Sequence, residues 1–255
     1  MPGARRPSGD GLGGEQVEGR RAVLELLRAG RRAVRTVSVS RAARPDAALD
    51  EIRERAGSAL RVVDPDRIDA LARSDAPQGV VATAAALPVA DLDALFRAPD
   101  AFVVALDGVS DPRNLGAVAR AAETAGATGL VLPRHRSARV TPVVAKAAAG
   151  AIEHLPIALA AGIPHALERA RRAGCWTVGL DADAAGRTLA ELDLADQPIV
   201  LVLGSEGRGI ARLTSARCDV LVSIPMHGAI ESLNVAAAAA IACHEIARRR
   251  AALRS

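Results

Sequence analysis

Residues 198–209, PIVLVLGSEGRG, decide the fold of this chain. The first six residues are apolar, which is typical of a strand buried on both faces of a parallel sheet, and a glycine-rich turn follows directly. The same arrangement returns at residues 219–225, DVLVSIP, which lead into the polar loop 226–235, MHGAIESLNV. Because α/β proteins bind ligands at the carboxyl ends of parallel strands, these two loops predict a ligand site.

Strands and helices alternate along the rest of the chain, which predicts an α/β fold whose parallel sheet is covered by helices on both faces. In the C-terminal part we expect strands at 102–106, 129–132, 176–180, 198–203 and 219–224, and helices at 117–125, 137–149, 163–173 and 232–250. A smaller α/β unit precedes it, with helices expected at 20–29, 47–56 and 65–73, and strands at 34–40, 60–63 and 79–84.

Composition divides the chain into four parts. Residues 1–15 are rich in glycine, arginine and proline, and we expect a disordered tail because they cannot bury enough apolar surface. Residues 16–86 form a small N-terminal domain, residues 87–99 contain two prolines and form a linker with one short helical piece, and residues 100–255 form the second domain.

The charge balance favours an anionic partner. The net charge is +4 with a pI near 9.7, and Lys146 is the only lysine, so nearly all positive charge is arginine, which suits phosphate. Codon bias explains the arginine equally well, because alanine is also abundant. Aromatic residues are limited to Phe96, Phe102 and Trp176, which argues against nucleic-acid binding by stacking on aromatic side chains.

The cysteines and histidines give no sign of a metal site. Cys175, Cys218 and Cys243 are far apart, so we expect buried thiols in a reducing cytoplasm. The pair His244-Glu245 lacks the second histidine of an HExxH motif. An apolar signal core and a membrane-length apolar stretch are also absent from the sequence.

A third candidate loop follows the predicted strand at 102–106. The fingerprint GxGxxG of dinucleotide-binding folds is absent there, and the spacing Asn114-x-Gly116-x-x-x-Arg120 occurs instead. We expect Asn114 in a strand-to-helix loop, Gly116 to allow close backbone approach, and Arg120 to project to the same side one helical turn on. An amide and a guanidinium at a helix start suit a phosphate or a ribose. A capped helix with a surface arginine would give the same pattern.

Three segments taken together are more specific. Residues 114–122, 203–209 and 224–235 resemble, in that order, the three motifs of the SpoU (TrmH-like) ribose 2'-O-methyltransferases of the SPOUT superfamily. Residues 19–23 and 78–80 resemble the substrate-binding domain of the bacterial 23S ribosomal RNA guanosine-2'-O-methyltransferases. The stretch LDGVSDPRNLG at 106–116 is also similar to that subgroup, whereas Pro77 stands where the subgroup often has histidine.

The resemblance implies a fold, a reaction and partners. The fold would be a SPOUT-type parallel sheet with a C-terminal trefoil knot, preceded by a small α/β (L30e-like) domain that binds RNA. The enzyme would transfer a methyl group from S-adenosylmethionine to a ribose 2'-hydroxyl of 23S ribosomal RNA, without a metal. It would be a cytoplasmic homodimer joined through the C-terminal domain, and it would bind neither membrane nor DNA.

The resemblance also implies site residues. The cofactor would be held, largely by backbone groups, at Leu203, Gly204, Gly209, Ile224, Pro225, Met226 and Leu233. The catalytic residues would be Arg120, Asn114, Glu206, Ser232 and Asn234. Because arginine stays protonated at neutral pH, we expect Arg120 to bind an RNA phosphate and to stabilise the developing oxyanion. Asn114, Ser232 and Asn234 would orient the ribose and the loop.

Structural alternatives remain for several of these residues. Glu206 would pair with an arginine or hold its loop, but it could equally be a solvated turn residue, and Ser232 could be the N-cap of the last helix. That helix carries small apolar residues at helical spacing, which suits a dimer seam or an ordinary core face. The run Arg248–Arg250 would bind RNA or complement the helix C-terminus.

Two other functions fit the same motifs. The chain could methylate transfer RNA or another ribosomal site, as in antibiotic resistance, or it could be an RNA-binding relative that has lost catalysis. The extra N-terminal domain argues against a minimal transfer RNA enzyme. All five catalytic candidates are retained, which argues against lost catalysis.

Overall fold

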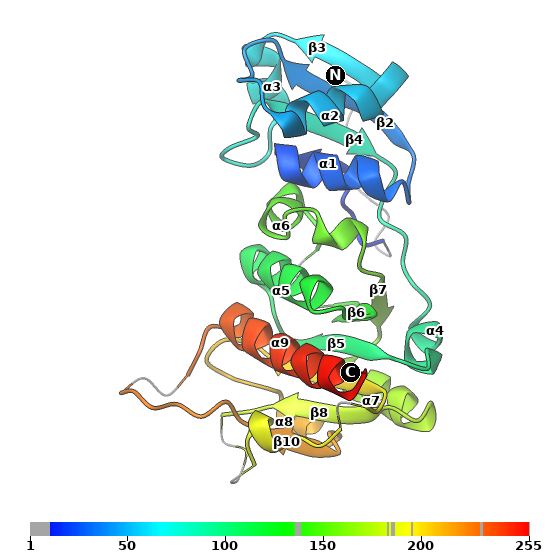
Figure 1. Ribbon diagram of the computed structural model, residues 1–255, viewed down its shortest axis with the longest axis vertical. Helices are drawn as coiled ribbons and strands as arrows, with labels where there is room; N and C mark the ends of the chain where they lie inside the picture. The colour runs from blue at the N-terminus through cyan, green and yellow to red at the C-terminus, as the bar shows by residue number, and fades with distance from the viewer. Residues whose placement is uncertain are drawn as a thin grey trace.

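The structure, a computed structural model, describes residues 11–135, 139–182, 184, 187–194, 196–229 and 232–254. The molecule is elongated, with one sheet toward each end (Figure 1). The N-terminal sheet has four strands in the order β1-β4-β2-β3, and the C-terminal sheet has six in the order β10-β8-β9-β5-β6-β7.

The N-terminal sheet is mixed. β1 and β2 both run antiparallel to β4, and β2 runs parallel to β3. Its elements are β1 Gln16–Glu18, α1 Arg20–Ala29, β2 Val34–Ser40, α2 Ala47–Ala56, η1 Gly57–Ala59, β3 Leu60–Val63, α3 Pro65–Leu71 and β4 Val80–Ala84. The six predicted elements are confirmed, and α3 ends two residues early because Ala72 is extended. β1, which is three residues long, was not predicted.

Every strand pair of the C-terminal sheet is parallel, which confirms the predicted fold class. Its strands are β5 Phe102–Asp107, β6 Gly129–Pro133, β7 Ile157–Ala160, β8 Trp176–Leu180, β9 Ile199–Gly204 and β10 Val220–Val222. Its helices are α4 Leu92–Arg97, α5 Pro112–Thr124, α6 Pro142–Ala147, η2 Ala151–Glu153, α7 Ile163–Arg172, η3 Leu189–Glu191, α8 Arg212–Ser215 and α9 Val235–Arg254. β7 was missed, and the trefoil knot stays a prediction.

Side chains of the central strand β5 alternate between the two covered faces. Phe102, Val104 and Leu106 belong to the core that contains residues of α5, α6 and α9, whereas Val103 and Ala105 belong to the core that contains residues of α4 and α7. Burial of one large apolar side chain stabilises the folded state by roughly 1.5–3 kcal/mol. Because β5 buries side chains on both of its faces, it contributes to the stability of both cores.

Helix α5 begins earlier than predicted. Its N-cap is Asp111, whose side chain accepts a hydrogen bond from the N–H of Arg113 at 2.7 Å, and a proline occupies the first turn. Asn114 therefore lies in the helix and not in the loop before it. Asn114 and Arg120 are six residues apart, about 600° of helical rotation, so the prediction that they project to one side is wrong.

Gly116 is a helix-packing residue. A Cβ atom at this position would lie 2.5 Å from the Cβ of Ala147 and 2.7 Å from the carbonyl oxygen of Val144. The glycine therefore lets α5 approach α6 closely. We predicted that Gly116 lets a ligand approach the backbone, whereas the structure shows that it lets a neighbouring helix approach.

Residues 11–15 correct the predicted tail of residues 1–15. Residues 1–10 lie outside the described chain, but Leu12 is buried and Gly13 forms a parallel bridge with Val140. The carbonyl of Glu15 accepts a hydrogen bond from the N–H of Ala84 at 2.8 Å. Two glycines, at positions 13 and 14, adopt positive φ angles and allow this close fit, which composition alone did not suggest.

The segment predicted as a linker, residues 87–99, packs against the C-terminal sheet. Val89 bridges to Ile157 of β7, and the short helix α4 buries Leu92, Leu95 and Phe96 in one of the two cores. The segment is therefore part of the folded C-terminal unit rather than a free tether.

A buried ion pair joins the N-terminal unit to the C-terminal unit. Arg32 donates to both carboxylate oxygens of Glu153, with its Nε at 2.9 Å and its Nη2 at 2.5 Å. Their side chains are 2% and 1% exposed. Nη1 of Arg32 also donates to the carbonyls of Gly14 and Ala85, each at 2.6 Å. All partners of this guanidinium are therefore supplied inside the junction.

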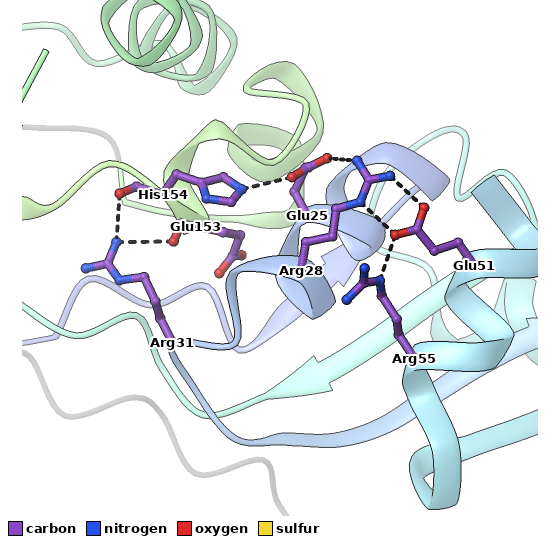
Figure 2. Close-up of polar contacts among 7 residues, drawn as sticks. All are labelled: Glu25, Arg28, Arg31, Glu51, Arg55, Glu153 and His154. Atoms are coloured by element: carbon purple, nitrogen blue, oxygen red, sulfur yellow. Dashed lines mark hydrogen bonds and ion pairs between the residues drawn. The ribbon is translucent and has the colours of Figure 1, made fainter. Parts of the chain in front are cut away.

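A chain of polar contacts extends from the junction along the surface of α1 and α2. Figure 2 shows Arg31 donating to the carbonyls of Glu153 and His154, both at 3.1 Å, and the ring of His154 against Glu25 at 2.9 Å. The same chain continues from Glu25 through Arg28 and Glu51 to Arg55 (Figure 2).

Gly150 permits the close approach behind these contacts. It lies at φ +88, and a Cβ atom there would sit 2.4 Å from the Cβ of Glu25. The two units thus share one continuous apolar core that runs from α1 to α5.

Candidate functional site

A cavity of about 550 Å³ opens at the carboxyl ends of β8, β9 and β10. Cavities of this size are typical of small-molecule sites. The structure brings together in its lining all seven residues predicted to hold the cofactor: Leu203, Gly204, Gly209, Ile224, Pro225, Met226 and Leu233. The two loops quoted first therefore meet at one site, as the parallel strands predict.

A third segment completes the cavity. Leu180, Asp181 and Ala182, at the end of β8, also line it, and they were not predicted as site residues. β8 lies between β9 and β10 in the sheet, so its end must face the same cavity. Strand order is the signal that would have found these residues, and sequence alone did not supply it.

The glycine turn after β9 is folded tightly on itself. Ser205 and Gly209 exchange two backbone hydrogen bonds, each of 3.0 Å. A Cβ atom at Gly204 would lie 2.0 Å from the carbonyl carbon of Gly209, so any side chain there would break the turn. The turn therefore requires a glycine at position 204, and this glycine also lines the cavity.

The cavity offers backbone polar groups beside apolar walls. Within the described chain, the N–H and C=O groups of Ile224, Met226 and Leu233 form no hydrogen bond. Backbone groups that lack a protein partner at a cavity wall are available to the hydrogen-bonding groups of a ligand. The side chains of Leu180, Leu203 and Val235 supply apolar surface around it.

Asn234 joins three elements at the mouth of the cavity. Its Nδ2 donates to Oδ1 of Asn114 at 3.2 Å and to Oε1 of Glu206, and its Oδ1 accepts from the N–H of Ala236 at 2.8 Å. The last contact caps α9, so the alternative that Ser232 is the N-cap is wrong. Glu206 is bound by an amide, and no arginine of the described chain pairs with it.

The five predicted catalytic residues therefore separate. Asn114, Glu206 and Asn234 form one hydrogen-bonded group, and Ser232 lines the cavity with Glu206. Arg120 is exposed on α5 and does not line the cavity. Its guanidinium makes no hydrogen bond or ion pair with any residue that the structure describes, so it remains able to bind an anion.

The two faces of α9 have different roles. Val235, Ala239, Ala242 and Ile246 are buried in the core of the chain itself, so the predicted apolar positions form a core face. The opposite face exposes small and apolar residues, among them Ala237, Ala240 and Ile241.

The arginines at the end of α9 are structural. Arg250 donates to the carbonyls of Asp100, Ala101 and Gln197 and lies 5.2 Å from the centre of the Phe102 ring. Arg249 donates to the carbonyls of Ala190 and Leu192, and Arg248 pairs with Glu245. These contacts tie α9 to residues 100, 101, 190, 192 and 197, and none of them reaches the last turn of the helix, which ends at Arg254. RNA binding by this run and a complement to the helix C-terminus both stay predictions.

The cysteines are protected by the fold. Cys175 and Cys243 are buried, and burial raises the pKa of Cys243 to about 12.

Among the described residues no group of three or more His, Cys, Asp or Glu side chains could hold a metal ion. No helix in the same residues is long and apolar enough to cross a membrane.

Known proteins match both units of the chain. Residues 101–244 match the family model "SpoU rRNA Methylase family", and residues 16–90 match "RNA 2'-O ribose methyltransferase substrate binding". A relative in Ralstonia nicotianae, named 23S rRNA (guanosine-2'-O-)-methyltransferase RlmB, is 42% identical over 77% of this chain and 80% of its own. YacO of Bacillus subtilis (strain 168), assigned by name to the TrmH family of tRNA/rRNA methyltransferases, is 36% identical over 92% of this chain and 96% of its own.

A solved structure of a similar protein contains a cofactor. The SpoU methyltransferase AviRb from Streptomyces viridochromogenes, in complex with the cofactor AdoMet, matches with a TM-score of 0.77 and 28% identity over 93% of this chain and 90% of its own. With the family models and the cavity loops, this establishes that the chain belongs to the SpoU rRNA methylase family and is an S-adenosylmethionine-dependent RNA 2'-O-methyltransferase.

Proposed function

We propose that this enzyme methylates the 2'-hydroxyl of a guanosine in 23S ribosomal RNA. The observation that carries the proposal is the 42% identity to the relative named for that reaction, together with the N-terminal unit that matches the substrate-binding model. With that substrate we expect the enzyme to act in the cytoplasm. We further propose that residues 16–86 bind RNA and that residues 100–255 carry the chemistry.

The cavity loops suit the cofactor. S-adenosylmethionine supplies an activated methyl group, so the chain must hold it, position the ribose and assist loss of one proton. The open backbone groups of Ile224, Met226 and Leu233 would pair with the adenine edge. The tight turn at Gly204 holds one wall of the cavity in place.

The polar group beside the cavity would position the substrate. Asn234 fixes Glu206 and Asn114 against the start of α9, so these side chains present a preformed polar surface to a ribose. Arg120 has no partner among the described residues, and we propose that it binds the RNA phosphate and stabilises negative charge developing on the 2'-oxygen. Ser232 would contact the ribose from the cavity side.

We also propose a homodimer formed through the C-terminal unit. The supporting feature is the exposed face of α9, where Ala237, Ala240 and Ile241 offer small side chains that permit close helix approach. Sedimentation of the full chain tests this. A monomer at micromolar concentration would contradict the proposal, and Ile241→Glu should dissociate the dimer.

The decisive experiment maps 2'-O-methyl groups. A deletion strain should lose one 2'-O-methylguanosine in 23S ribosomal RNA, and the purified enzyme should restore it with S-adenosylmethionine. Relatives such as YacO are named for tRNA or rRNA, so transfer RNA from the same strain is the comparison. Loss of a transfer RNA methyl group with intact 23S RNA would replace the proposed substrate.

A further inference from the structure

A second and larger cleft lies in the N-terminal unit. Its volume is about 1090 Å³, and it is bounded by α1, α2, α3 and the loop that leads into β4. None of its lining residues belongs to the cofactor cavity. In Figure 1 the loop between α3 and β4 and the loop between β10 and α9 both project from the left side of the molecule.

A strained turn forms one edge of this cleft. The N–H of Val80 donates to the carbonyl of Pro77 at 3.0 Å, and both residues between them have positive φ angles, +54 at Gln78 and +75 at Gly79. Two positive φ angles define a type I′ turn, which favours Asn, Asp or Gly at its first central position. A glutamine there is strained, so the fold must hold it.

Contacts from α1 hold this glutamine. The N–H of Arg20 donates to Oε1 of Gln78 at 3.0 Å, and Nε of Arg20 donates to the carbonyl of Gln78 at 3.2 Å. The buried carboxylate of Glu18 anchors the same loop through the N–H groups of Arg73 and Ser74, at 2.7 and 3.0 Å. The carboxamide is therefore fixed by its oxygen, while its Nε2 makes no hydrogen bond within the described chain.

The charges around the cleft are unevenly paired. Arg20 and Arg28 are matched by Asp46, Glu25 and Glu51.

Arg21 and Arg44 also line the cleft, are exposed, and form no ion pair or hydrogen bond with other described residues through their guanidinium groups. Leu24, Ala43 and Ile68 supply apolar lining between the polar groups. The cleft thus combines two free cations, an apolar surface and one fixed amide donor.

These features match an unpaired nucleotide. Phosphates take guanidinium contacts, a splayed base takes the apolar surface, and base carbonyl oxygens accept from an amide. We propose that this cleft binds an unpaired segment of the RNA substrate, with Gln78 Nε2 donating to a base carbonyl and with Arg21 and Arg44 on the flanking phosphates. The proposal rests on the proposed function in that RNA is the substrate.

The test separates the amide from the fold. Gln78→Glu keeps an acceptor for the N–H of Arg20 and removes the donor, and a negative charge at the start of α1 favours the helix. In the full chain, affinity for a single-stranded fragment of 23S ribosomal RNA should fall about tenfold, as for loss of one good hydrogen bond. Affinity for S-adenosylmethionine, measured by calorimetry, should not change.

The two arginines have a matched control. The double variant Arg21→Ala/Arg44→Ala should reduce the slope of log K against log salt by about 1.4, as for two phosphate contacts on a single strand. Arg35→Ala/Arg172→Ala removes the same charge at exposed positions outside the cleft, and it should leave the slope nearly unchanged. Both double variants change only exposed side chains, so they should stay folded even if the Gln78→Glu variant unfolds.

Three results would overturn the proposal. The first is an unchanged RNA affinity in Gln78→Glu. The second is an equal decrease of the salt slope of RNA binding in both double arginine variants, which would mean that RNA is attracted by diffuse charge and not by the cleft. Alternatively, RNA binding could survive all cleft changes while methylation of assembling ribosomal particles is lost, which would assign the cleft to a protein. Failure to methylate any RNA would instead refute the proposed function, since these binding measurements do not require turnover.

Discussion

Glu153→Gln should weaken the folded state far more than an ordinary surface substitution. The change keeps the side-chain shape but removes the negative charge that faces Arg32 inside the junction, where both side chains are almost fully buried. Breaking a buried pair by altering one partner costs about 3–5 kcal/mol because a buried charge loses its counter-charge. One amide oxygen can still accept from Arg32, so we expect the lower end, about 3 kcal/mol.

Urea unfolding followed by circular dichroism measures this difference. The matched control is Glu51→Gln, which breaks the ion pairs of Arg28 and Arg55 on the exposed surface and should cost at most about 1 kcal/mol. The double change Arg32→Met/Glu153→Leu should recover only part of the loss. Apolar residues of similar volume replace the buried ion pair well, but the carbonyls of Gly14 and Ala85 lose their donor. Equal losses in Glu153→Gln and Glu51→Gln would refute the reasoning.

Three further predictions concern the site and the core. Arg120→Ala should lower the single-turnover methylation rate by about 100-fold or more, as for loss of one oxyanion donor, while calorimetry shows unchanged cofactor affinity. Gly204→Ala should abolish cofactor binding in calorimetry, because the new methyl group would overlap the backbone of Gly209; wild-type affinity would contradict this. Cys243 should resist thiol reagents at pH 8 until urea unfolds the chain. Since burial raises its pKa from 9.0 to about 12, its contribution to stability should be present below pH 9 and lost as pH rises toward 12.

The sequence predicted those features that depend on local pattern. The apolar run at 198–203 and its glycine turn predicted a buried strand with a ligand loop, and β9 with its cavity wall has that form. The start of α5 was predicted too late, although the sequence carries its signal: Pro112 follows Asp111, and a proline in the first turn after an aspartate N-cap marks a helix start.

Other features depend on contacts between distant residues. Arg32 and Glu153 are 121 positions apart, and nothing local distinguishes them from solvated charges. The place of Asp181 in the cavity depends on strand order, and the role of Gly116 depends on the neighbour that α5 meets. β1 and β7 were too short, at three and four residues, for their alternation to be detected.

The junction between the two units limits how such an enzyme can diversify. A recognition module attached by a loose tether can be exchanged between relatives by a single recombination event. A transplanted module that lacked an arginine at the place of Arg32 would leave Glu153 buried without its counter-charge, and one with a different helix surface would not fit against Gly150. For such a module, both sides of the junction would have to be exchanged together. With the proposed role of the cleft, new RNA targets would be reached more readily by point changes at Arg21 and Arg44, whose side chains form no hydrogen bond or ion pair across the junction with any described residue.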